Sequence, residues 1–245
     1  MKTKLIGYFS IGYPDVERSM EIADSYVKSG IDIIEIGFPC DNPYLDNEYI
    51  GNTLKCAYNN FKDADAVFDA VDELLKRHAD TPVILLMYDH IIRDYVGVDK
   101  FIERASKSGI KDIILVGSED ESVKDTLISN GFNVSCYITY GLPDNEIESA
   151  RNSNAFIYLQ AKPDGNVRPG CETLAQCVKY LRDKGIKNPI YAGVGISTPD
   201  DVKMIAEAKA EGCFIGSALL KKTGDIKQLE EYVKSLKDAR DSAEI

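Results

Sequence analysis

Runs of apolar residues with the length of buried strands alternate along the chain with segments of helical periodicity. A parallel strand covered on both faces is a continuous apolar run, whereas a surface helix repeats its apolar residues every three or four positions. Strands are predicted at residues 5–11, 31–38, 83–88, 112–116, 134–139, 156–160, 190–194 and 213–215. Amphipathic helices are predicted at residues 16–28, 66–77, 99–107, 122–129, 172–184, 199–210 and 226–239.

The number of these units indicates the architecture. Eight strands that alternate with helices within 245 residues are typical of an α/β protein of the (β/α)8 TIM-barrel class. A doubly wound sheet is the alternative, but it usually has fewer strands and often a glycine-rich turn after the first one. Here Gly12-Tyr-Pro14 follows the first strand. We therefore predict one (β/α)8 TIM barrel, a single domain spanning residues 1–245.

A carboxylate stands inside one of the apolar runs. In Ile31-Asp-Ile-Ile-Glu-Ile-Gly-Phe-Pro39, side-chain alternation places Glu35 on the same face as Ile31 and Ile33. Burial favours the protonated form of such a group, because desolvation of its charge is costly. A protonated glutamate in a dry pocket is a suitable general acid. The alternative is a structural carboxylate that backbone amides or a nearby lysine satisfy.

Other candidate residues lie where the strands end, because catalytic groups of such barrels gather at the carboxyl ends of strands. Glu35 is near the end of the second strand, and Asp46 follows in the next loop. Tyr8, Tyr88 and Tyr158 are on three other strands. These tyrosines suggest a flat aromatic ligand. Alternatively, they fill the barrel interior and extend their hydroxyl groups to water.

Two glycine-containing segments predict an anion site. Gly193-Val-Gly-Ile-Ser-Thr-Pro-Asp-Asp201 leads from the seventh strand into a helix, with Thr198 as its expected cap and Pro199 in its first turn. Gly216-Ser-Ala218 follows the eighth strand. Loops after strands seven and eight of these barrels recurrently bind phosphate through backbone N–H groups and a short helix. Outside such a barrel, each segment would indicate only a turn and a cap.

Composition limits the classes of partner. Forty acidic and 29 basic residues give a net charge of -11, which disfavours nucleic acid as a partner. The first residues lack the pattern of a signal peptide, and no apolar run reaches the roughly 18 to 20 residues that span a bilayer. We expect a cytoplasmic protein that binds neither nucleic acid nor a membrane.

Metal ligation is not indicated by the sequence. The two histidines, His78 and His90, are isolated, and the cysteines show no CxxC spacing. We therefore expect reduced thiols, no metal and no cofactor. The six cysteines are Cys40, Cys56, Cys136, Cys171, Cys177 and Cys213.

Over nearly its whole length, the chain resembles the α subunit of tryptophan synthase. The resemblance lies in Gly12-Tyr-Pro-Asp15, Glu35-Ile-Gly-Phe-Pro39 with Asp46 downstream, Leu85-Leu-Met-Tyr88, Gly193-Val-Gly-Ile-Ser-Thr-Pro199 and Gly216-Ser-Ala218. It implies a lyase of tryptophan biosynthesis. This lyase cleaves indole-3-glycerol phosphate to indole and glyceraldehyde 3-phosphate by retro-aldol general acid/base catalysis, which requires no cofactor.

The resemblance also implies roles for individual residues. Glu35 would protonate indole C3, while Asp46 would hold the indole N–H and stabilise positive charge on the ring. Tyr158 corresponds to a family tyrosine beside the glutamate. The positions that correspond to the indole pocket are Tyr8, Ile50, Leu86 and Tyr88, and those that correspond to phosphate contacts are Gly195, Gly216 and Ser217.

Several segments depart from the usual family sequence. Asp41-Asn-Pro-Tyr-Leu-Asp-Asn-Glu48 replaces Ser-Asp-Pro-Leu-Ala-Asp-Gly-Pro, a loop that normally contacts a pyridoxal-phosphate-dependent β subunit. The implied β partner would therefore meet an altered surface. Residues 117–121 replace an Asp-x-Pro turn, and residues 161–170 replace a short lid, which could alter the substrate or its enclosure. Val194 stands where the family often has phenylalanine, which would widen the aromatic pocket.

Two other interpretations stay open. A paralogue could keep Glu35 and the phosphate site but act on a different phosphorylated substrate. In that case Lys162, near the end of the sixth strand, is a candidate Schiff-base nucleophile. A non-catalytic barrel could instead bind a partner subunit, although the presence of both acids and the altered interface loop argue against it.

Overall fold

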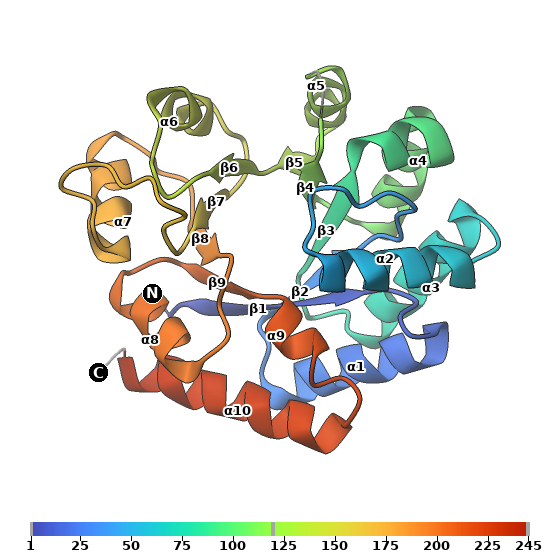
Figure 1. Cartoon of the computed structure of the whole chain (residues 1–245). Helices are drawn as coiled ribbons and strands as arrows, with labels where there is room; N and C mark the ends of the chain where they lie inside the picture. Colours follow the sequence, from blue (N-terminus) through green and yellow to red (C-terminus); the bar gives the residue numbers. More distant parts are fainter. Residues whose placement is uncertain (1, 119–120, 244–245) are drawn as a thin grey trace. The chain divides into compact units, whose positions relative to one another are not determined.

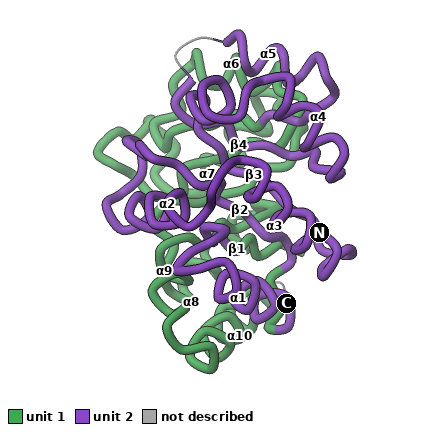
Figure 2. Tube along the Cα trace, turned by 90° about the vertical axis from the view of Figure 1, so that its right-hand side faces the viewer, with its two compact units in different colours: residues 1–7, 29–31, 135–245 green, residues 8–28, 32–134 purple. Residues whose placement is uncertain are grey.

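The computed structural model describes residues 2–118 and 121–243. Parallel strands alternate with helices along the chain, which confirms the predicted (β/α)8 class (Figure 1). The chain forms two compact units (Figure 2). Unit 1 contains residues 1–7, 29–31 and 135–245, and unit 2 contains residues 8–28 and 32–134. The extension of one domain over residues 1–245 stays a prediction.

Unit 2 has a parallel sheet whose strands pair in chain order, from β2 to β5. The last part of β1 also belongs to this unit. The strands are β1 (Lys4–Ser10), β2 (Ile33–Gly37), β3 (Val83–Tyr88), β4 (Asp112–Val116) and β5 (Asn133–Val134). The helices are α1 (Val16–Ser29), α2 (Glu48–Asn60), α3 (Ala64–Arg77), the π-helical η1 (Ile91–Val96), α4 (Val98–Ser108) and α5 (Ser122–Ser129).

Local signals in the sequence explain where helices of unit 2 begin. Asn47 and Asp63 cap α2 and α3, because their side chains accept hydrogen bonds from backbone N–H groups of the first turn. Aromatic packing then joins the helices to the strands. The ring of Phe68 on α3 lies 5.4 Å from that of Phe38 and 6.1 Å from that of Phe101 on α4. All three rings are buried and form part of the core of unit 2.

Unit 1 has a second parallel set of strands, in the order β1, β9, β8, β7 and β6. Helix α10 packs along α8, as the red and orange ribbons in Figure 1 show. The strands are β6 (Cys136–Ile138), β7 (Ile157–Gln160), β8 (Ile190–Gly193) and β9 (Gly212–Ile215). The helices are α6 (Asp144–Arg151), α7 (Leu174–Asp183), α8 (Pro199–Glu207), α9 (Ser217–Leu220) and α10 (Ile226–Ala243).

All eight predicted strands are present, but the fifth is divided. The run predicted at residues 134–139 becomes β5 and β6, separated at Ser135, so the described residues contain nine strands. The division arises because β5 pairs with β4, whereas β6 pairs with β7. Helix α6 escaped prediction because it buries only Ile147 and Ala150, which gives too little apolar periodicity. Within the described part of the chain, no helix has the length and apolar character needed to cross a membrane.

Candidate active site

Glu35 is a buried acid in the middle of β2. Its side chain is only 4% exposed, and its position pairs with Ile84 of β3. Burial, reinforced by the negative charge of Asp46, raises the pKa of Glu35 to about 8. Among residues 2–118 and 121–243, no hydrogen bond or ion pair to its carboxyl group is found. Glu35 is therefore protonated at neutral pH. The alternative of a structural carboxylate that pairs with a lysine does not apply.

Asp46 lies in the loop between β2 and α2 and has a more polar environment. The hydroxyl group of Tyr88, the last residue of β3, donates a 2.8 Å hydrogen bond to Asp46 Oδ2. The same hydroxyl oxygen accepts a hydrogen bond from the backbone N–H of Leu45 at 3.1 Å. Burial raises the pKa of Asp46, while the hydrogen bond from Tyr88 opposes that shift. The strand end thus fixes the loop aspartate in position.

Tyr8 of β1 is close enough to both acids to feel their charges. Burial first, and then the charges of Asp46 and Glu35, hold the pKa of Tyr8 well above its usual value. Its hydroxyl group lies 3.1 Å from Ser10 Oγ, which is itself 2.7 Å from the hydroxyl oxygen of Thr53 on α2. The Tyr8 ring crosses Gly37 so closely that a Cβ there would collide with its hydroxyl group. A neutral hydroxyl group is therefore held beside the two acids.

Two partly exposed apolar side chains complete the predicted positions in unit 2. Ile50 is in the first turn of α2, and Leu86 pairs with Gly37 across β2 and β3. On β3, Leu85 and Met87 are buried, so the alternation gives Leu86 the opposite face. Unit 2 thus contains six of the residues predicted from sequence: Tyr8, Glu35, Asp46, Ile50, Leu86 and Tyr88.

The predicted phosphate segments are both in unit 1. Ala192 of β8 pairs with Cys213 of β9, so the two segments follow the ends of neighbouring parallel strands. Val194 and Gly195 adopt positive φ angles of 73° and 75° in the first segment. Gly216 caps α9, whose first residue is Ser217. The predicted cap of α8 is confirmed, because Thr198 and Asp201 form a capping box and Pro199 begins the helix.

Lys162 closes the β8–α8 loop through contacts with Gly195 and Asp201 that were not predicted from the sequence, and we call this set of contacts the Lys162 clasp. Lys162 Nζ donates a 2.7 Å hydrogen bond to the carbonyl oxygen of Gly195 and forms a 2.6 Å ion pair with Asp201. Asp201 also accepts hydrogen bonds from the backbone N–H groups of Ser197 and Thr198. Burial would raise the pKa of Asp201, but these contacts outweigh it and lower the pKa. Both contacts of Lys162 use its ammonium form, which favours a structural role over Schiff-base chemistry.

Tyr158 also belongs to unit 1. Its ring stacks on Phe214 at a centroid distance of 4.3 Å and meets Tyr137 edge-on at 5.5 Å. It also lies against Gly193, where a Cβ would be 2.6 Å from its hydroxyl oxygen. These contacts fix the ring on the strands of unit 1. The role inferred for Tyr158 beside the glutamate stays a prediction.

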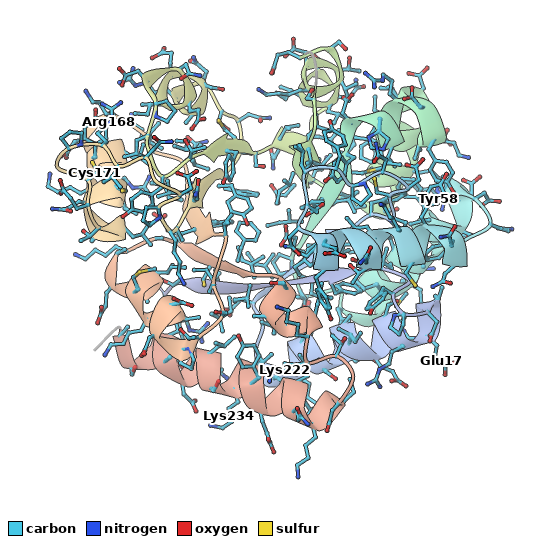
Figure 3. All side chains as sticks on the ribbon, viewed as in Figure 1. Glu17, Tyr58, Arg168, Cys171, Lys222 and Lys234 are labelled. Carbon is cyan, nitrogen blue, oxygen red and sulfur yellow. The ribbon has the colours of Figure 1, made fainter. Side chains whose placement is uncertain are left out.

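Arg168 fixes the altered lid, residues 161–170, through hydrogen bonds and an ion pair. Its guanidinium group donates to the carbonyl oxygen of Leu142 at 2.6 and 3.1 Å, and it pairs with Asp144 at 2.7 Å. It also donates to the Tyr180 hydroxyl group at 2.8 Å. Figure 3 shows Arg168 on the segment that precedes α7. The lid therefore has an anchor at the start of α6. In the altered turn after β4, residues 119–120 lie outside the described residues.

Known proteins resemble the chain in both sequence and structure. A sequence model of the family described as tryptophan synthase alpha chain matches residues 1–244. The tryptophan synthase alpha chain of Leptospira biflexa is 29% identical over 226 residues, which cover 89% of this chain and 84% of that protein. The alpha chain of Archaeoglobus fulgidus is 28% identical over 94% of this chain and 97% of that protein.

Solved structures extend the likeness. Tryptophan synthase subunit alpha from Legionella pneumophila is 26% identical and has a TM-score of 0.82, covering 98% of this chain and 93% of that one. A structure from Aquifex aeolicus is also 26% identical, with a TM-score of 0.84 and coverage of 97% and 93%. Because the family model matches almost every residue, the chain belongs to the tryptophan synthase alpha chain family.

Proposed function

We propose that the chain cleaves indole-3-glycerol phosphate to indole and glyceraldehyde 3-phosphate, as a carbon–carbon lyase of tryptophan biosynthesis. Family membership supports this reaction. The observation that carries the proposal is the pair formed by Glu35 and Asp46, two acids in different environments. One is kept protonated by burial, and the other is held by a tyrosine in a partly exposed loop. Two such carboxyl groups can divide the tasks of an acid and a charge stabiliser.

The first step uses the proton of Glu35. Its carboxyl group donates this proton to indole C3, and the ring becomes a positively charged indoleninium. The carboxylate of Asp46 accepts a hydrogen bond from the indole N–H and stabilises the new positive charge. This stabilisation is strongest in a site shielded from water. Ile50 and Leu86 supply the partly exposed apolar surface for the flat ring, together with the rings of Tyr8 and Tyr88.

The second step breaks the carbon–carbon bond. The hydroxyl group on the adjacent glycerol carbon loses its proton and becomes the aldehyde carbonyl. The electron pair of the broken bond returns to the indole ring and neutralises it. The carboxylate that Glu35 forms in the first step can accept the hydroxyl proton, which restores the acid for the next turnover. No cofactor takes part in either step.

We assign the phosphate group of the substrate to Gly195, Gly216 and Ser217. Both segments follow neighbouring strand ends, and the Lys162 clasp shapes the first of them. Val194 and Tyr158 are assigned to substrate binding and catalysis by the same family resemblance. We also propose that residues 1–245 form one (β/α)8 domain and that the enzyme is cytoplasmic, as its biosynthetic family suggests.

A β-type subunit is the proposed protein partner. Tyr44 and Leu45 are 52% and 62% exposed in the loop that carries Asp46. Tyr44 and Leu45 are adjacent, and exposed apolar side chains that lie together favour a protein contact. A partner on this loop would act on the Asp46 position directly. Co-purification with a pyridoxal-phosphate-dependent subunit, abolished by Tyr44→Asp with Leu45→Asp, tests this contact.

An assay of indole release tests the reaction. The wild type should release indole from indole-3-glycerol phosphate, and Glu35→Gln should lower turnover by several orders of magnitude, as expected for a central acid. Asp46→Asn should also lower it strongly. Glu48→Gln, a change from carboxyl to amide at the first residue of α2, is the matched control and should be nearly neutral. A Glu35→Gln enzyme with near-normal activity would exclude the role of Glu35.

The altered lid favours one competing candidate, a paralogue that acts on another phosphorylated substrate. Its distinguishing outcome is an inert wild type that still binds simple sugar phosphates. A chain that binds neither indole-3-glycerol phosphate nor a sugar phosphate would instead be a non-catalytic barrel for a partner subunit. The same preparation of wild-type protein serves all three comparisons.

A further inference from the structure

Three potential metal ligands meet next to, but outside, the proposed reaction centre. Cys40 and Asp41 follow β2, and His90 follows β3. Parallel pairing explains their meeting, because it offsets the two strands by 49 positions, as in Gly37 with Leu86. Asp41 and His90 are also 49 positions apart. The strand register therefore brings together residues that are too distant in sequence to form a recognisable metal motif.

The distances between the ligand atoms match a metal site. His90 Nε2 lies 3.6 Å from Cys40 Sγ and 3.3 Å from Asp41 Oδ1. All three ligand atoms lie within 4.8 Å of one another. With zinc bonds of about 2.3 Å to sulfur and about 2.0–2.1 Å to nitrogen and oxygen, a tetrahedral site separates sulfur from nitrogen by about 3.5 Å and nitrogen from oxygen by about 3.3 Å. A small movement of the carboxylate is sufficient to accept the ion.

The surroundings favour a cation. The negative charges of Asp41 and Asp46 are both felt at Cys40 and exceed the smaller opposing effect of the positive charge of Lys55. An acidic field concentrates cations. The His90 ring is packed 5.5 Å from Tyr88 and 6.4 Å from Tyr44, which limits its rotation. Tyr58 of α2, labelled in Figure 3, is also close to Cys40 and Asp41. Its pKa is raised by desolvation first, and then by the charges of Asp41 and Cys40.

We propose that Cys40, Asp41 and His90 form a binding site for a divalent transition-metal ion, best suited to Zn²⁺, with water as the fourth ligand. Thiolate, imidazole and carboxylate are the ligand types that zinc selects. On binding, the Cys40 thiol releases its proton to solvent and the sulfur forms the bond to the metal. Burial raises the pKa of Cys40 to about 12, so the metal itself has to displace this proton.

The site would act on the loop that carries Asp46. An ion held by all three ligands joins the β2–α2 loop to His90, which lies two residues beyond the end of β3. Asp46 is five positions beyond Asp41, and its partner Tyr88 is two positions before His90. Metal occupancy would therefore restrict the loop, without any part for the metal in carbon–carbon cleavage.

Titration with Co²⁺ and Zn²⁺ tests the site on the full chain. Co²⁺ should bind with one equivalent and give the near-ultraviolet absorption of a cobalt–thiolate bond, and Zn²⁺ should displace it. Cys40→Ser should abolish the absorption, and His90→Gln should weaken binding at least tenfold, as for loss of a ligand. The matched controls are Cys56→Ser and His78→Gln. His78 contacts Asp24 at 2.8 Å in a similar way, and the metal trio does not include it.

A second measurement covers the case of a variant that folds poorly. Asp41→Asn keeps the thiol and the imidazole, and the Asp41 side chain is more than half exposed, so its fold should be preserved. Zn²⁺ should raise the thermal midpoint of the wild type and raise it less for Asp41→Asn, because a ligand that binds only the folded state stabilises it. Cobalt binding without thiolate absorption, or absorption that persists in Cys40→Ser, would overturn the proposal.

Discussion

The hydroxyl group of Tyr88 donates a 2.8 Å hydrogen bond to Asp46, although the two residues are 42 positions apart. Tyr88 is the last residue of β3 and is almost completely buried, so its ring cannot follow movements of the loop. Asp46, by contrast, belongs to a loop whose neighbouring side chains are exposed. The rigid strand therefore sets the position of a functional group that the loop alone would leave variable.

Tyr88→Phe should reduce turnover while leaving the protein folded. The change removes the donor to Asp46, and loss of one hydrogen bond to a charged group costs about 1.5–3 kcal/mol, or roughly tenfold to a hundredfold in rate. Since this hydrogen bond lowers the pKa of Asp46, its loss should move the acidic limb of the pH–activity profile to higher pH. Tyr44→Phe, which removes a hydroxyl contact with Gly117 at the surface, is the control. An unshifted profile in Tyr88→Phe would contradict the assignment.

Glu35 should make stability depend on pH in a defined window. The folded protein retains the Glu35 proton up to about pH 8, whereas the unfolded chain releases it near about pH 4.3. Between these values the folded state binds more protons, so the contribution to stability is full at the acidic end and is lost as pH rises to about 8. The slope is about 1.4 kcal/mol per pH unit.

Glu35→Gln isolates this effect, because glutamine has nearly the same shape and does not titrate. Urea unfolding of both proteins at about pH 5, 7 and 9 should show the variant gaining stability relative to the wild type as pH rises. The difference between the proteins should level off above the folded pKa. A constant difference across the range would show that the carboxyl group is not held protonated.

Val194→Gly should stabilise the protein. Val194 has a φ of 73°, which a β-branched residue adopts only with strain, and its side chain is 48% exposed. Relief of about 1–3 kcal/mol of strain should outweigh the entropy cost of about 0.5–1 kcal/mol for glycine. Val167→Gly, at another exposed valine, is the control and should lower the thermal midpoint or leave it unchanged. A lower midpoint for Val194→Gly would contradict this account.

Lys162→Met should weaken substrate binding more than turnover. The change removes the contacts to Gly195 and Asp201 that close the β8–α8 loop. We expect a severalfold rise in KM, little change in kcat, and a stability loss of about 1 kcal/mol, since the lysine is partly exposed. Lys179→Met removes an exposed ion pair within α7 and should do neither. If kcat falls and KM stays constant, Lys162 takes part in the chemistry instead.

The sequence was sufficient for features that depend on local periodicity. Side-chain alternation in residues 31–38 correctly predicted that Glu35 is buried, and the apolar run at residues 83–88 matched β3 residue for residue. The cap at Thr198 was equally local. In each case, neighbours in the chain determine the burial or the hydrogen bond, so a single sequence contains the whole signal.

Features that depend on strand register or on long-range contacts were not predictable in this way. The continuous run at residues 134–139 gave no sign of the break at Ser135, because the break reflects a change of partner strand. The Lys162–Asp201 clasp joins residues 39 positions apart, and the Cys40–His90 contact joins residues 50 apart. Neither pair has a recognisable spacing until the strands are aligned.

The break at Ser135 makes the chain a candidate for fragment complementation. A cut after Val134 would leave residues 8–28 and 32–134 on one polypeptide and most of the other unit on the second. The amino-terminal piece would still carry Lys4–Gly7 of β1, and the residues of β9 that pair with them, Gly212–Ile215, would be on the carboxyl-terminal piece. Pairing of this segment with β9 would hold the two pieces together. Co-expressed halves should therefore reassemble into the native enzyme without an added linker.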